Sequence, residues 1–229
     1  WSSLAARGAC SHPMLRRCTC GCHRGYREGF EPPTLKMMNV HDAVASRRSV
    51  RDFLPTPVPG DVIRRVLQAA AHAPSGGNLQ PWHIDVVAGD RLAQLKALLR
   101  ERIASGVREA TEYDIYPPQL PSPYRDRRYE LGEAMYARLG IPREDKLARL
   151  GWFMRNYEAF GAPLVIFCSV HRRLGPPQWS DLGMFLQTVM LLLRAEGWDS
   201  CAQESWSTFP RTVGEFLGLP DERMLFCGM

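Results

Sequence analysis

Residues 73–82 read Ala-Pro-Ser-Gly-Gly-Asn-Leu-Gln-Pro-Trp. The two adjacent glycines remove side-chain obstruction, so a flat ligand can approach the backbone closely. Ser75, Asn78 and Gln80 add neutral hydrogen-bonding groups, and Trp82 adds an apolar plane. The same composition also suits an ordinary turn between a helix and a strand, so the stretch alone leaves both interpretations open.

Two further stretches carry candidate functional residues. Arg47-Arg-Ser-Val-Arg51 lies at the exit of a predicted helix. Guanidinium groups offer forked donors that suit phosphate, and the Ser49 hydroxyl adds another donor. On spacing alone, a solvated basic helix end is the better explanation of this stretch. Cys201-Ala-Gln-Glu-Ser-Trp206, by itself, fits an ordinary edge strand and loop.

Hydrophobic periodicity around these stretches predicts several helices and few strands, which is typical of an α+β fold. Helices are expected over residues 40–48 after an Asn39 cap, from an Asp61 cap to before Pro74, over 92–103, from Ser180 or Asp181 to about Glu196, and over 210–217. Strands are expected over residues 83–88, 163–170 and 224–227. The helix that ends near Glu196 is apolar around almost its whole circumference, which predicts burial in a core or against a partner subunit.

Residues 112–150 are rich in proline, tyrosine and arginine, and we interpret them as an insertion or lid. Arg125, Arg127 and Arg128 within this segment are candidates to meet a carboxylate on a substrate. A solvated charged helix explains these three arginines at least as well.

Composition excludes some classes of function. The chain has 229 residues and 45% hydrophobic content, enough to bury the core of one domain, and no apolar run is long enough to span a bilayer. The net charge of +5 belongs mostly to residues 1–36, because residues 37–229 hold 23 basic and 22 acidic side chains. A nearly neutral body gives no electrostatic footprint for nucleic acid.

The N-terminal residues 1–36 are expected to be a disordered or non-native tail, with Met37 or Met38 as the true start; a transit peptide is also compatible. Cys18-Thr-Cys20-Gly-Cys22-His23 invites a metal interpretation, but its spacing differs from that of structural zinc sites, so no metal site is expected. The three cysteines of residues 37–229 (Cys168, Cys201, Cys227) are scattered, which favours a reducing compartment and hence the cytoplasm.

In this order and spacing, the three stretches resemble the nitroreductase family. Arg47-Arg-Ser-Val-Arg-Asp-Phe53 is similar to the family's R-x-S-x-[RK]-x-F signature, and residues 73–82 are similar to its A-P-S-x-x-N-x-Q-P-W signature. The resemblance extends over about residues 39–229. The proline-rich insertion and Gln203-Glu-Ser-Trp206 look more like the branch that includes nitrobenzoate reductases.

The resemblance implies a nitroreductase-like α+β fold, with a central mixed or antiparallel sheet flanked by helices and the long buried helix at a homodimer interface. It implies one FMN per interface, held by residues of both subunits. One subunit would hold the phosphate, ribityl chain and ring edge through Arg47, Arg48, Ser49 and Arg51, and would lie beside the isoalloxazine ring with Gln203, Glu204 and Ser205. The other subunit would supply Pro74, Ser75, Gly76 and Asn78.

Two departures from the family pattern are visible. Ala202 stands where the family often has proline. The family continues beyond the position of Met229 with a glycine-rich turn, a basic residue that contacts the FMN phosphate, and an arm around the partner. The resemblance therefore implies that this domain, residues 37–229, is C-terminally truncated.

The implied function is an FMN-dependent oxidoreductase. It would use NAD(P)H to reduce nitroaromatic or quinone-like small molecules in a ping-pong cycle through flavin N5, with no catalytic side chain. Two alternatives stay open: a related flavin enzyme with another acceptor, such as a dehalogenase or desaturase, and a non-catalytic flavin- or metal-binding protein that works through its cysteine-rich tail.

Overall fold

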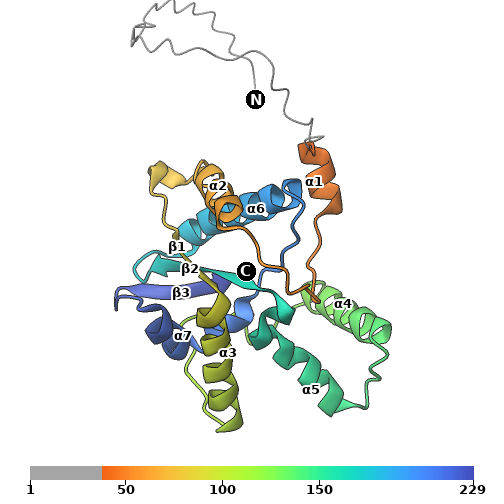
Figure 1. Ribbon diagram of the computed structural model, residues 1–229. Helices are drawn as coiled ribbons and strands as arrows, with labels where there is room; N and C mark the ends of the chain where they lie inside the picture. Colours follow the sequence, from red (N-terminus) through yellow and green to blue (C-terminus); the bar gives the residue numbers. More distant parts are fainter. Residues whose placement is uncertain (1–37) are drawn as a thin grey trace, which may run out of the picture. The chain divides into compact units, whose positions relative to one another are not determined.

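The computed structural model describes residues 38–229, which form an α+β fold (Figure 1). The expected tail, its cysteines and a start at Met37 lie outside the described residues. The helices are α1 (Val40–Ser46), α2 (Gly60–Ala70), α3 (Gly89–Ala104), α4 (Tyr124–Arg138), α5 (Lys146–Met154), α6 (Pro176–Ala195) and α7 (Pro210–Leu217), with short 3₁₀ turns η1 (Gly76–Asn78), η2 (Arg155–Gly161) and η3 (Glu204–Thr208).

The central sheet has three antiparallel strands in the order β1-β2-β3: β1 (His83–Ala88), β2 (Leu164–His171) and β3 (Arg223–Gly228). Every β2 residue from Val165 to Val170 is buried, as expected for the middle strand of a covered sheet. The three predicted strands are confirmed to within one residue at either end. The antiparallel pairing agrees with the sheet that the family resemblance implied.

Helices cover both faces of the sheet because successive β2 side chains point to opposite sides. Ile166 and Cys168 pack in a cluster with buried residues of α2 and α6. Val165 and Phe167 pack in a second cluster with buried residues of α3 and α7. Figure 1 shows the two helix pairs on opposite sides of the strands. The core therefore consists of two apolar layers separated by β2.

The first two helices differ slightly from prediction. Asn39 caps α1 as expected, since its side-chain oxygen accepts from Asp42 N at 2.9 Å, but the helix ends at Ser46 rather than two residues later. α2 begins one residue before Asp61, so the predicted Asp61 cap is wrong. The Asp61 carboxylate instead forms an i,i+4 ion pair with Arg65 at 2.6 Å.

α6 begins at Pro176, so the predicted start at Ser180 or Asp181 is also wrong. Proline suits the first helical turn, where a backbone N–H has no intrahelical partner. Met184 of α6 is 40% exposed, so within one chain this helix is not buried around its whole circumference. None of the helices in the described part of the chain is long and apolar enough to cross a membrane.

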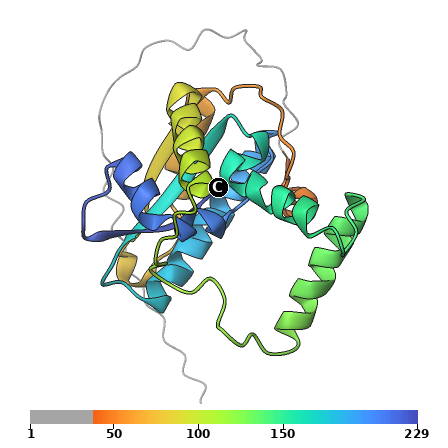
Figure 2. The ribbon, with the colours of Figure 1, turned by 90° about the horizontal axis from the view of Figure 1, so that it is seen from below.

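The segment interpreted as a lid is largely helical. α4 contains no buried residue, and Figure 2 shows it standing apart from the sheet and its covering helices. Glu133 of α4 accepts hydrogen bonds from both terminal nitrogens of Arg149 of α5, at 2.6 and 3.0 Å. The loop that leads into α4 is fixed to β3 by Tyr113, whose hydroxyl donates to the Phe226 carbonyl. The two helices thus form a braced hairpin beside the core.

The three cysteines of the described residues are free and buried. Burial raises the pKa of Cys168 to about 12 and raises those of Cys201 and Cys227 as well. Cys168 and Cys227 therefore behave as small buried hydrophobes. Among residues 38–229, no three His, Cys, Asp or Glu side chains gather where they could hold a metal ion.

Candidate functional site

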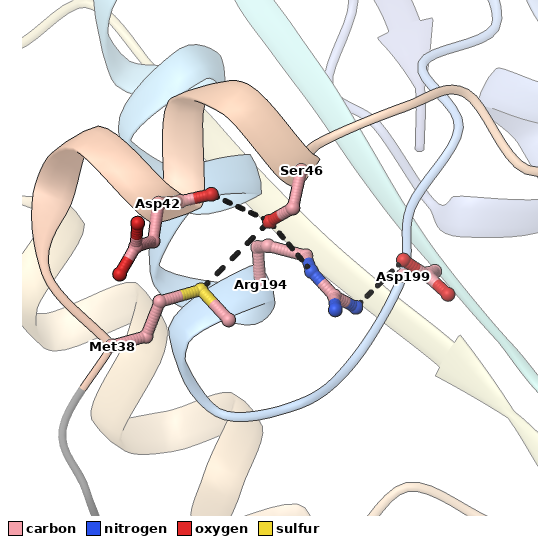
Figure 3. A network of polar contacts seen from close by, with 5 residues as sticks. All are labelled: Met38, Asp42, Ser46, Arg194 and Asp199. Atoms are coloured by element: carbon pink, nitrogen blue, oxygen red, sulfur yellow. Dashed lines mark hydrogen bonds and ion pairs between the residues drawn. The ribbon is translucent and has the colours of Figure 1, made fainter.

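The basic stretch (residues 47–51) leaves α1 and runs beside the chain that follows α6. Ser46, the last residue of α1, accepts a hydrogen bond from Arg194 Nε at 3.1 Å (Figure 3). Ser49 then forms a parallel bridge with Ser200, and the following residue's N–H donates to the Ser200 carbonyl at 3.2 Å. The basic stretch therefore lies next to the start of the third candidate stretch.

The three arginines of the basic stretch are not neutralised by a neighbour. No carboxylate within residues 38–229 forms an ion pair with Arg47, Arg48 or Arg51. In contrast, Asp52, the residue that follows the stretch, pairs with Arg155 at 2.7 Å. Three unpaired guanidinium groups on one short segment create a positive potential and a set of donors suited to an anion such as phosphate.

The glycine loop (residues 74–80) has a strained backbone. Gly77, Asn78 and Gln80 all have positive φ, at 59°, 57° and 47°, which costs energy for the two residues with side chains. Ser75 Oγ accepts from Gln80 N at 2.9 Å, and Gln80 Nε2 donates to Asn78 Oδ1 at 2.9 Å. These bonds preserve the strained turn and leave the Ser75 hydroxyl proton and the Asn78 amide nitrogen free to donate.

The glycine loop is anchored to the beginning of α6. Both carboxylate oxygens of Asp181, which is 5% exposed, lie 3.3 Å from Gly76 N. The Trp82 ring stacks on Phe185, with centroids 4.8 Å apart, so one face of the expected ligand plane is used in packing. Sequence reasoning missed the anchoring role of Asp181; its signal was that Asp181 is the only acidic residue of a largely apolar helix.

The third stretch forms a turn (residues 203–205) that Gln203 holds in place. Gln203 is buried, and its Nε2 donates to the Asn156 carbonyl at 2.9 Å while its Oε1 accepts from Trp206 Nε1 at 3.2 Å. Its backbone exchanges hydrogen bonds of 2.7 and 3.0 Å with Gly228 of β3. Because both its side chain and its backbone have internal partners, Gln203 positions the turn.

The next two residues of the turn keep groups available. Ser205 Oγ is buried and has no hydrogen-bond partner among the described residues. Native proteins rarely leave such a hydroxyl unpaired, so it is a natural contact for a ligand. Partial desolvation raises the pKa of the Glu204 carboxyl. An unpaired hydroxyl and an acid with a raised pKa thus lie a few residues from the bridge to the basic stretch.

The glycine loop lies far from the other two stretches within one chain. It contacts α6 at Asp181, whereas Ser46 contacts α6 at Arg194. Thirteen residues of helix separate these contacts, which corresponds to about 20 Å. Figure 1 shows α1 near one end of α6 and the loop of residues 76–78 near the other. One chain therefore brings the basic stretch and the turn together but not the glycine loop.

The arginines of the lid do not meet the other candidate residues through any hydrogen bond or ion pair of the described residues. Arg125 pairs with the adjacent Asp126 at 2.7 Å, and Arg128 lies over the Tyr116 ring, 4.2 Å from its centroid. Arg127 is exposed. These contacts favour the solvated charged helix over a substrate-binding role for the three arginines.

An apolar cavity of about 350 Å³ lies behind the basic stretch. Its lining includes Val50, Phe53, Ile166, Leu193 and Cys201. Sequence reasoning missed this cavity because its walls come from segments far apart in the chain. Its volume falls within the range of small-molecule pockets.

Comparison with known proteins places these stretches in a family. The model of the Nitroreductase family matches residues 44–229. A 4-nitrobenzoate reductase of Pseudomonas putida is 38% identical over 186 residues, which cover 81% of this chain and 81% of that protein.

Solved structures agree. The FMN and NADPH-dependent nitroreductase NfnB from Sphigopyxis sp. strain HMH is 47% identical, with a TM-score of 0.81 over 83% of this chain and 86% of that one. The FMN-dependent nitroreductase NfnB from Mycobacterium smegmatis in complex with NADPH is 31% identical, with a TM-score of 0.78 over 82% and 84% of the two chains. The fold, the spacing of the three stretches and these matches together show that the chain belongs to the nitroreductase family.

Proposed function

We propose that the protein is an FMN-dependent oxidoreductase that uses NAD(P)H to reduce nitroaromatic or quinone-like small molecules. One observation carries this proposal: the basic stretch, whose arginines form no ion pair among the described residues, lies beside the turn that holds the unpaired buried hydroxyl of Ser205. The relatives' names as nitroreductases favour a nitroaromatic acceptor over dehalogenation or desaturation.

The residues present fit FMN. Arg47, Ser49 and Arg51 would bind its phosphate and ribityl chain, and Arg48 would add to the positive potential. Ser205 Oγ has a free hydroxyl to donate to a ring acceptor. FMN held by these residues would supply the hydride- and electron-transfer chemistry that couples NAD(P)H to the acceptor.

The protein's own groups would then tune the site rather than react. Although Glu204 is exposed at the surface, partial desolvation of its carboxyl raises its pKa, so it takes up a proton more readily than a fully solvated carboxyl, which eases the placement of negative charge nearby. Gln203 would contribute indirectly, through the backbone position that its bonds to Asn156 and Gly228 impose. No side chain is required as a nucleophile.

A second copy of the chain would complete each site. The glycine loop, with Pro74, Ser75, Gly76 and Asn78, lies about 20 Å along α6 from the basic stretch, so a symmetric dimer offers a way for both to serve one flavin. Exposed apolar side chains support this proposal: Val40 and Val44 of α1, and Met184 of α6, are 63%, 56% and 40% exposed. In the proposed dimer, residues 37–229 form the FMN-binding domain and residues 112–150 its lid. We further propose that the enzyme is cytoplasmic.

Flavin content and turnover test the proposal together. The full chain incubated with FMN and desalted should keep the flavin's yellow colour and oxidise NADPH only when a nitroaromatic or quinone is added. Arg51→Met should weaken FMN retention, while Arg65→Met, an arginine paired with Asp61 on α2, should not. Protein that stays colourless, or that turns over neither class of acceptor, would refute the proposed function.

A further inference from the structure

The guanidinium group of Arg194 joins two segments of the chain that meet at the candidate site. Arg194 lies in the last turn of α6, and its side chain is 26% exposed. Its Nε donates to Ser46 Oγ at 3.1 Å, and one terminal nitrogen donates to Asp199 Oδ1 at 3.0 Å (Figure 3). One planar group thus binds a side chain of α1 and a side chain of the segment after α6.

Each partner of Arg194 directly precedes a part of the site. Ser46 is followed by Arg47, where the basic stretch begins. Asp199 is followed by Ser200, which bridges Ser49 and leads into the turn at residues 203–205. Arg194 therefore fixes the starting points of the two segments on which the phosphate contacts and the ring contacts depend.

The Ser46 hydroxyl is hydrogen-bonded both within its own helix and to Arg194. Its hydroxyl donates to the Asp42 carbonyl at 2.6 Å and accepts from Arg194, so both its proton and a lone pair are engaged (Figure 3). A cation in the last turn of a helix is favourable for the helix dipole whatever else it touches. That general effect explains a basic residue at this position, but it does not require bonds to two different segments.

We propose that Arg194 is a positioning residue for FMN, an inference that rests on the proposed function. It sets the basic stretch, which takes the phosphate, relative to the turn, which takes the ring. Its own charge is offset by Asp199, so it acts through the two segments rather than by attracting phosphate itself. Lysine is a poor substitute because a single ammonium lacks the fixed fork of donors that reaches both partners.

A comparison of two flavins tests this role. Flavin-free full-length protein would be titrated with FMN and with riboflavin, which lacks the phosphate, and binding followed by quenching of flavin fluorescence. In Arg194→Met and Arg194→Lys the Kd for FMN should rise about tenfold, because the link that holds Ser46, and with it the start of the basic stretch, to Asp199 is lost. The Kd for riboflavin should change by less than about twofold, because the turn that takes the ring is also held by the hydrogen bonds of Gln203 to Asn156 and Gly228. Loss of Arg194 should therefore displace mainly the basic stretch, which riboflavin does not need.

Two further variants secure the interpretation. Arg65→Met removes an arginine that pairs with Glu196 at the same end of α6, at 3.2 Å, but contacts neither segment, so it should bind both flavins as the wild type does. Ser46→Ala removes one partner of Arg194 without changing any charge and should raise the Kd for FMN selectively, by a smaller factor. If circular dichroism shows that Arg194→Met does not fold, the ratio of FMN and riboflavin affinities in Ser46→Ala still tests the inference.

The outcomes separate the two claims. Wild-type protein that binds neither flavin would overturn the proposed function and this inference with it. If the wild type binds FMN but the ratio of the FMN and riboflavin Kd values is the same in the Arg194 and Ser46 variants as in the wild type, the inference alone is overturned. This holds whether the affinity for both flavins falls equally or for neither. A selective loss of FMN affinity supports it.

Discussion

Alanine at Gly228 should destabilise the protein markedly. A Cβ there would lie 2.5 Å from Trp206 Cδ1 and 2.8 Å from its Nε1. Trp206 is fully buried and packs edge-on against Phe167 and Tyr157, with ring centroids 5.2 and 6.2 Å away, so it has little room to move aside. The substitution would also disturb the Trp206 hydrogen bond to Gln203.

The magnitude follows from these two effects. Overpacking a closed core costs about 1–3 kcal/mol, and a lost buried hydrogen bond costs about 1 kcal/mol. The free energy of unfolding should therefore fall by about 2–4 kcal/mol, and the melting temperature by roughly 5–15 °C for a domain of this size.

Thermal and urea unfolding followed by circular dichroism measure the effect. Gly132→Ala is a matched control, because a Cβ there meets no atom within 4 Å and Gly132 lies inside α4. It should stabilise its helix by up to about 1 kcal/mol. If Gly228→Ala unfolds at the same temperature and urea concentration as the wild type, the β3 backbone or Trp206 yields easily and the packing argument fails.

Two further substitutions test other parts of the fold. Glu109→Ala should cost about 1–2 kcal/mol in urea unfolding, because its carboxylate accepts from Arg211 N at 2.8 Å and from Thr212 N at 3.2 Å in the first turn of α7; an effect no larger than that of the exposed Glu101→Ala would contradict this capping role. For Glu204, desolvation raises the pKa in the folded state above its value in the unfolded chain. The ionised carboxylate therefore destabilises the folded state: the cost is absent below both pKa values, grows as the pH rises between them, and is complete above the folded-state pKa. Glu204→Gln should accordingly gain stability over the wild type in urea unfolding at pH 8 but not at pH 4, and an equal difference at both would rule out the desolvation explanation.

The elements that sequence predicted well are those whose pattern is local. β2 was predictable because an uninterrupted apolar run of this length is typical of a buried strand. The Asn39 cap was predictable because its side chain accepts from the backbone of Asp42, only three residues away. Asp61 and Asp181 misled because both are good capping residues by type. Their carboxylates are used elsewhere, one by Arg65 and the other by the backbone of Gly76, and the latter contact spans more than a hundred residues.

The candidate site divides in the same way. The basic stretch and the glycine loop were proposed as site residues only because together they resemble two signatures of one family; each alone fits an ordinary helix end or turn. The role of Gln203 was not predictable, because its partners Asn156 and Gly228 come from distant segments that only folding brings together. α4 was foreseen only as an alternative, a solvated charged helix around its arginines, because it has no buried face and hence no periodic apolar pattern to predict it.

This chain should carry electrons from NAD(P)H to a nitroaromatic when FMN is bound. The most direct test of this claim is an anaerobic absorbance titration of the FMN-loaded full chain. NADPH should bleach the flavin band, and 4-nitrobenzoate or another nitroaromatic added afterwards should restore it, with neither step occurring for protein-free FMN on the same timescale. A flavin band that NADPH leaves unchanged, or a bleached band that no nitroaromatic or quinone restores, would contradict the claim.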